Sequence, residues 1–288
     1  NGVTCLGFSS GARYLSAGHG NGRILIWDLK TGTVIKEFHL VDNAEAEEAN
    51  PDKGQSKTLY SNPIVSLVFS PSDSYIAVTL EMKSVVRDEQ PSKTSCVYLF
   101  SVVSQRLVGK FHTRGSGTIR HIKFSPLKRS WLAAVNDDGD VYVWDINIKP
   151  PSIRRVSPAA AGDTPNSTSS TILSLFHFMK SPATGLSFYT ANSSHILIVA
   201  STDGSIYFID LNIKKVVRHL EINKAITSVD VISNSMLLTT DQGKIMVYSS
   251  IESLMNTTNH GAKENQESSN SATLSVTLWL GHSSPITA

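Results

Sequence analysis

Nine histidines are spread along the 288-residue chain, and they are the first place to look for chemistry. A histidine near an aspartate, such as His112 with the later Asp138, is a pairing that hydrolases use for a base and its orienting partner. However, the sequence contains no Gly-x-Ser-x-Gly turn, no phosphate-binding P-loop, no His-Glu-x-x-His and no paired Cys-x-x-Cys. We therefore expect no catalytic residues, no metal, no cofactor and no small-molecule substrate, in a protein that is not an enzyme.

Basic side chains provide the candidates for binding a partner. Lys128 and Arg129 lie in a predicted turn between two strands, and Lys214 and Lys215 lie in a loop that follows one. Together with Arg120 they would suit an acidic protein surface or a phosphorylated motif. The alternative interpretation is that they belong to ordinary solvated loops.

Charge and hydropathy argue against other partners. The formal net charge of +2 is too small to predict nucleic-acid binding. Phe and Tyr alternate within predicted strands, which is typical of a core and not of a platform for single-stranded nucleic acid. No run of eighteen apolar residues predicts a transmembrane helix. We expect protein partners, with no nucleic acid and no membrane.

The elements that would position these residues repeat along the chain. In five places, a predicted tight turn is followed by a strand that ends in Trp-Asp or in a degenerate form of that pair. The best preserved positions, which we expect to be structural, are Trp27, Asp28, Asp138, Trp144, Asp145, Asp203, Asp210 and Tyr248. This is the WD-repeat signature, and it predicts an all-β WD40 β-propeller.

The blade explains the pattern. Glycine after the turn residue tolerates a positive φ in a tight hairpin, and alternating side chains reach both faces of a sheet packed between two neighbours. In WD blades, a histidine ahead of the first strand often bonds to the turn aspartate and the tryptophan. His112, Asp138 and Trp144 are candidates for such a structural network, although Ala134 and Asn136 stand where a hydroxyl is expected.

The repeats also divide the chain. Blade-like units are predicted at about 3–40, 62–111, 118–155, 183–221 and 225–279, with the start of a further blade at 281–288. Since WD propellers commonly close with about seven blades, we expect a fragment of a longer protein with about five blades present. Polar insertions at about 41–57, 82–95, 157–170 and 255–272 are expected to be flexible, either as docking and phosphorylation segments or as tolerated loop length.

Composition fits a folded β-protein. Hydrophobic residues make up 40% of the chain and charged residues 17%, enough to bury a large core. Cys5 and Cys96 fall in apolar strand stretches of different units. We interpret them as small buried side chains in a reducing, cytoplasmic compartment.

A more specific resemblance follows from the third unit onwards. Ile119–Ser125, Leu127–Leu132 and Val143–Asp145 resemble, in order, a blade of the NEDD-type adaptors, the centrosomal WD-repeat proteins that recruit γ-tubulin. The later blades and the stretch around Trp27 continue this similarity. The acidic insertion after the first unit and the long hairpin of the second depart from it, and the helical region with which that family grips the γ-tubulin complex is absent.

The resemblance implies a scaffold that docks at centrosomes or spindle poles, with γ-tubulin complex components or other centrosomal proteins as partners. Two alternatives stay open from the sequence. One is a generic WD40 scaffold, such as a ubiquitin-ligase substrate receptor or a trafficking adaptor. The other is a propeller enzyme, which would need acidic or histidine side chains converging on a central channel.

Overall fold

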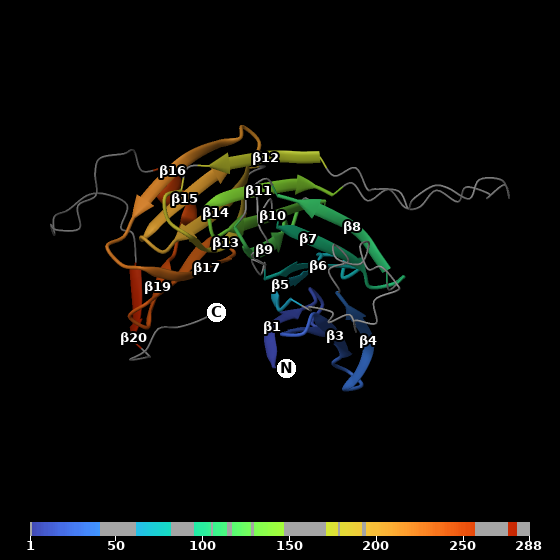
Figure 1. Ribbon diagram of the computed structural model, residues 1–288. Coiled ribbons are helices and arrows are strands. Elements are labelled where there is room, and N and C mark those ends of the chain that lie inside the picture. The colour runs from blue at the N-terminus through green and yellow to red at the C-terminus, as the bar shows by residue number, and fades with distance from the viewer. Residues whose placement is uncertain are drawn as a thin grey trace, which may run out of the picture. The chain divides into compact units, whose positions relative to one another are not determined.

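The computed structural model describes residues 2–40, 62–81, 95–104, 106–113, 117–127, 130–146, 171–177, 179–191, 194–256 and 276–280 (Figure 1). The chain divides into two compact units, Asn1–Phe176 and His177–Ala288. Each unit is described separately below.

The first unit contains three antiparallel sheets of four strands each. Sheet A consists of β1 (Val3–Phe8), β2 (Tyr14–His19), β3 (Arg23–Asp28) and β4 (Thr33–His39). Sheet B consists of β5 (Ile64–Phe69), β6 (Tyr75–Leu80), β7 (Cys96–Ser101) and β8 (Arg106–His112). Sheet C consists of β9 (Ile119–Phe124), β10 (Trp131–Asn136), β11 (Asp140–Asp145) and β12 (Thr171–His177), the last of which reaches the boundary between the units.

The second unit repeats this design in two sheets. Sheet D consists of β13 (Ala183–Ala191), β14 (Ser194–Ser201), β15 (Ser205–Asp210) and β16 (Lys215–Glu221). Sheet E consists of β17 (Ile226–Ile232), β18 (Ser235–Thr240), β19 (Lys244–Tyr248) and β20 (Val276–Leu280). A short helix, α1 (Ile251–Asn256), follows β19. Among the described residues, no helix has the length and apolar character needed to cross a membrane.

Neighbouring sheets pack face to face, as alternation along the strands predicts. Ile24 and Ile26 of sheet A are fully buried against sheet B, and the rings of Phe38 and Phe100 meet across this interface at 5.0 Å. The first strands of adjacent sheets lie side by side, β1 with β5, β5 with β9 and, in the second unit, β13 with β17. Because sheet B is buried between two hydrophobic layers, its strands need apolar residues on both faces.

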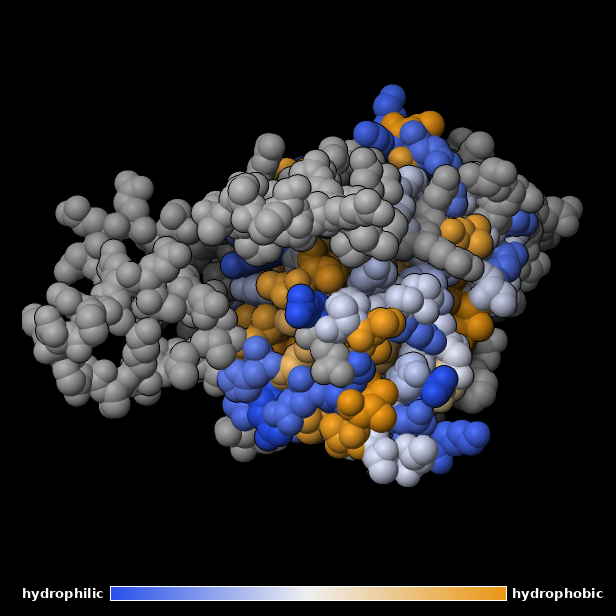
Figure 2. All heavy atoms as spheres, turned by 90° about the vertical axis from the view of Figure 1, so that its right-hand side faces the viewer, coloured by the Kyte–Doolittle hydropathy of each residue, from blue (hydrophilic) through white to orange (hydrophobic). Residues whose placement is uncertain are grey.

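The outer strands are more exposed than the inner ones. Most residues of β4 and β8 are exposed, only Phe38, Gly109 and Phe111 are buried, and each strand has one register shift. On the side of the first unit that carries β4 and β8, hydrophobic and hydrophilic side chains lie next to one another (Figure 2). These edges provide most of the accessible strand surface discussed below.

The hairpin turns between the second and third strands follow the repeated motif. Gly22, Gly139, Gly204 and Gly243 all adopt a positive φ, between 72° and 89°. Glycine is the residue that enters this region at least cost, which explains its place in the motif.

Two features differ from the predicted unit boundaries. The strand that completes sheet C is β12, which lies beyond the unit expected at 118–155. Helix α1 overlaps the start of the insertion expected at 255–272. The remainder of that insertion, the insertions at 41–57 and 157–170, residues 82–94 of the insertion at 82–95 and the partial blade at 281–288 lie outside the described residues.

Candidate protein-binding surface

The two tryptophans of the repeated motif differ in burial. Trp144 is only 1% exposed and stacks on Tyr142 with 5.6 Å between ring centroids, while Phe111 of sheet B lies at 6.0 Å. Trp27 occupies the matching place in sheet A and is half-buried. Trp144 therefore packs sheet C against sheet B and is structural, whereas Trp27 lies on the face of sheet A that also carries the exposed Phe8.

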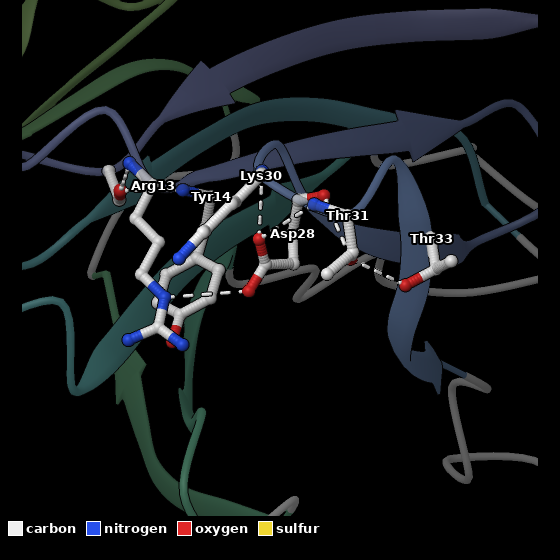
Figure 3. A network of polar contacts seen from close by, with 7 residues as sticks. Arg13, Tyr14, Asp28, Lys30, Thr31 and Thr33 are labelled. Carbon is white, nitrogen blue, oxygen red and sulfur yellow. Dashed lines mark hydrogen bonds and ion pairs between the residues drawn. The ribbon is translucent and has the colours of Figure 1, made fainter.

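The aspartate that follows Trp27 organises the next turn (Figure 3). Asp28 accepts hydrogen bonds from the backbone N–H of Lys30 at 2.8 Å and of Thr31 at 3.4 Å, and the guanidinium of Arg13 lies 3.4 Å away. The Lys30 N–H is the main reason that the pKa of Asp28 is lowered. The carboxylate therefore fixes the β3–β4 turn and leaves little capacity for a ligand.

Asp210 and Asp203 have related roles in the second unit. Asp210 accepts hydrogen bonds from the N–H groups of Asn212 at 2.8 Å and Ile213 at 3.4 Å, which repeats the arrangement at Asp28. Asp203 accepts one from Ser205 N at 2.9 Å in the β14–β15 turn. Tyr248 ends β19 and is buried, and Asp145 ends β11 and is half-buried.

The network predicted for His112, Asp138 and Trp144 is wrong. His112 ends β8 and lies opposite Cys96 in the register of sheet B, so its Nδ1 meets the Cys96 Sγ at 3.1 Å. Asp138 instead accepts a hydrogen bond from Gly117 N at 2.8 Å. Burial, with a smaller effect of Lys110, lowers the pKa of His112 and favours its neutral form. The structure thus places the buried Cys96 beside an imidazole whose neutral form is favoured.

A different polar network occupies sheet C. Asp140 Oδ2 accepts hydrogen bonds from the Tyr142 hydroxyl at 3.1 Å and from Asn136 Nδ2 at 3.3 Å, and Asn136 Oδ1 accepts one from Asp140 N at 2.7 Å. All three residues are buried. Asn136, which takes the place of the expected hydroxyl, therefore bonds to Asp140 and not to Asp138. Among the described residues, no group of three or more His, Cys, Asp or Glu side chains is placed to hold a metal ion.

The structure describes three of the five basic candidates, Arg120, Lys214 and Lys215. Arg120 is the second residue of β9 and is paired with Asp137, Nε to Oδ1 at 2.8 Å, with its side chain 40% exposed. Lys214, at φ 56°, and Lys215 are exposed at the β15–β16 turn of the other unit. Arg120 pairs with Asp137 in the turn between the second and third strands of its sheet. Lys214 lies in the turn between the third and fourth strands, which is the opposite end of an equivalent sheet. Lys128 and Arg129 lie outside the described residues.

A surface that sequence reasoning missed lies where β4 and β8 run along the outer edge of the first unit. We call it the rim patch and define it by Ile35, Lys36, Val103, Leu107 and Lys110. Val103 is 79% exposed and Leu107 is 49% exposed. Lys36 Nζ reaches across from sheet A to the carbonyl oxygen of Val103 in sheet B at 3.4 Å. The signal in the sequence was a valine or leucine beside a polar turn, which alone does not distinguish a surface from a core.

A second apolar surface lies on β1. Leu6 and Phe8 are 59% and 64% exposed, whereas Leu67 and Phe69, which hold the equivalent register positions of sheet B, are almost fully buried against sheet A. The exposed face of β1 in sheet A is therefore equivalent to the face of β5 with which sheet B packs on sheet A. This match supports sheets that pack as consecutive blades.

Comparison with known proteins agrees with this architecture. Residues 1–28 match the family described as WD domain, G-beta repeat. The β-propeller domain of Cps50 (Swd1) from Myceliophteria thermophila superposes with a TM-score of 0.59 at 15% identity, covering 85% of this chain and 65% of that one. A chain of the mitotic checkpoint complex gives a TM-score of 0.60 at 14% identity, with 86% and 63% covered. The five four-stranded sheets, two of which have a strand ending in Trp-Asp, therefore define a WD40-repeat β-propeller fold.

Within this class, the sequence is similar to Protein NEDD1. The human protein is 25% identical over 247 residues, which covers 85% of this chain and 30% of the relative. The mouse protein is 26% identical over 249 residues with the same coverage, and the Bos taurus protein is 28% identical over 154 residues, covering 53% and 20%. The chain thus spans less than a third of the length of these relatives. The similarity supports a WD-repeat scaffold.

Proposed function

We propose that this chain is the targeting part of a non-enzymatic adaptor that brings the γ-tubulin ring complex to centrosomes and the mitotic spindle, where microtubules are nucleated. The observation that carries this proposal is the collinear similarity to human NEDD1 over 85% of the chain. It agrees with the family resemblance of the third and later blades. The chain would act in the cytoplasm, at centrosomes and spindle poles.

The structure supports a binding role more than a catalytic one. The carboxylates of the motif, Asp28 and Asp210, are used to fix turns, and Arg120 is paired with Asp137. Exposed apolar and basic side chains instead occupy the outer strands. Lys128, Arg129, Lys214 and Lys215 remain proposed contacts with an acidic partner.

The test is a co-precipitation from dividing cells with the tagged complete gene product. We expect γ-tubulin to be recovered both by this protein and by a version that lacks residues 1–288, while only the former reaches spindle poles. Reversing the charges of Lys128 and Arg129 should abolish targeting without unfolding the protein. A ubiquitin-ligase or trafficking complex recovered in place of γ-tubulin would refute the adaptor role and identify a different WD40 scaffold.

A further inference from the structure

The two edge strands of the first unit form one continuous surface. Ile26 faces sheet B, and Lys36 lies opposite it in the register, so Lys36 also faces sheet B. Phe100 faces sheet A, and Leu107 lies opposite Phe100, so Leu107 faces sheet A. Since paired residues of adjacent strands share a face, Lys36 and Leu107 point toward the same gap between β4 and β8.

This surface is held in place by contacts between sheets A and B. Lys36 Nζ donates to the carbonyl of Val103 at 3.4 Å. At the same end of the two sheets, Asp73 of the β5–β6 turn accepts hydrogen bonds from Ser10 N at 2.7 Å and Gly11 N at 3.3 Å in the β1–β2 turn. A partner that binds here would therefore meet a largely preformed surface, which reduces the ordering cost of association.

The rim patch combines exposed aliphatic groups with positive charge. Val103 and Leu107 provide the apolar part. Lys36 and Lys110 provide the charge, and Lys110 Nζ lies 5.1 Å from the centre of the Tyr98 ring, which holds its stem along β8. Glu37 is the one acidic residue in β4 and β8. It lies on the opposite face of β4 and pairs with Arg23 at 2.8 Å.

We infer that the rim patch binds a short acidic peptide segment with bulky apolar side chains, contributed by a protein partner. Carboxylates would meet Lys36 and Lys110, and one or two large apolar side chains would cover Val103 and Leu107. The inference states which kind of partner the proposed scaffold would bind. It rests on the proposed function only in assuming that the chain binds proteins.

Recognition would use side chains and not strand addition. Each of β4 and β8 has a register shift, and such bulges disrupt the regular edge that a new strand would need. A membrane is the less suitable occupant, because the rim patch has no Trp or Phe to enter an interface and its apolar groups are few.

The test is a selection from a displayed library of random peptides with the purified protein as bait, followed by affinity measurements on the enriched synthetic peptides by fluorescence polarisation. We expect the enriched sequences to combine Asp or Glu with Leu, Ile or Phe. The double variant Val103→Asp, Leu107→Asp should bind them at least ~10-fold more weakly, because it removes the apolar contact and repels the acid. Lys110→Glu should weaken binding several-fold, and added salt should do the same to the wild type.

The control is the double variant Ile213→Asp, Val217→Asp, which changes similarly exposed residues at the matching turn and outer strand of sheet D. It should bind the peptides as the wild type does, and circular dichroism should show all variants folded. The inference is overturned if no acidic peptides are enriched, if the rim variant binds them normally, or if the control loses binding equally. If no acidic peptides are enriched and the protein instead sediments with phosphatidylserine vesicles, the rim patch binds a membrane and the inference is overturned. Failure of γ-tubulin co-precipitation would refute the proposed adaptor and leave this binding result unchanged.

Discussion

Substituting Gly204 by alanine should destabilise the second unit strongly. Gly204 sits at φ +89° in the β14–β15 turn, a region that costs an L-residue about 1–2 kcal/mol. An added Cβ would also collide with the carbonyl oxygen of Ile222 and approach that of Lys224 to 2.7 Å. Both are backbone atoms, and Ile222 N donates to Gly204 O at 3.0 Å, so relief requires the β16–β17 connection to move. Such overpacking adds about 1–3 kcal/mol, for a total of about 3 kcal/mol.

Gly32 provides the matched control. It has a φ of +69°, yet nothing lies within 4 Å of the Cβ that alanine would add. Gly32→Ala should therefore cost only about 1 kcal/mol, the backbone cost less the entropy gained from a stiffer unfolded chain. Urea unfolding followed by circular dichroism would compare the two, with hydrogen exchange locating the loss in sheets D and E. Equal costs for the two substitutions would refute the close approach seen at Gly204.

Three further predictions concern the core and its titration. Trp144→Ala should cost about 3–5 kcal/mol in urea unfolding because the ring is buried, and Trp27→Ala should cost less because its ring is half-exposed; the reverse order would contradict the packing. Tyr142→Phe should cost about 1–2 kcal/mol by the same assay, since it removes a buried hydrogen bond to Asp140, and no loss would show that bond to be unimportant. Burial lowers the pKa of His121 to about 4. Below the unfolded pKa of ~6.5 the unfolded chain binds a proton that the folded chain does not, so stability should fall by about 2 kcal/mol between pH 7 and pH 5. His121→Gln should flatten this part of a pH series of thermal melts, and an unchanged slope would contradict the assignment.

Local features of the sequence predicted the sheets well. The turn glycines and the Trp-Asp ends act within one hairpin, where the positive φ of Gly139 and the burial of Trp144 follow from residue type and spacing. The strand β12 was not predicted because it pairs with β11 across an insertion of more than twenty residues, and no local pattern ties the two together.

The candidate surface was harder to predict, for two physical reasons. The partner of His112 depends on the register of β7 and β8, which places Cys96 opposite it, and a one-residue slip would have changed that partner. The rim patch depends on how two sheets meet, since only their packing sets Lys36 beside the turn of Val103. The sequence alone does not show whether a valine at a turn is buried or exposed.

The most direct test of the central claim is imaging of spindle poles in cells that express the complete gene product or a version without residues 1–288 in place of the endogenous protein. The targeting role predicts that the deletion lowers γ-tubulin at the poles while γ-tubulin still co-precipitates with the truncated protein. Normal γ-tubulin at the poles without residues 1–288 would contradict it.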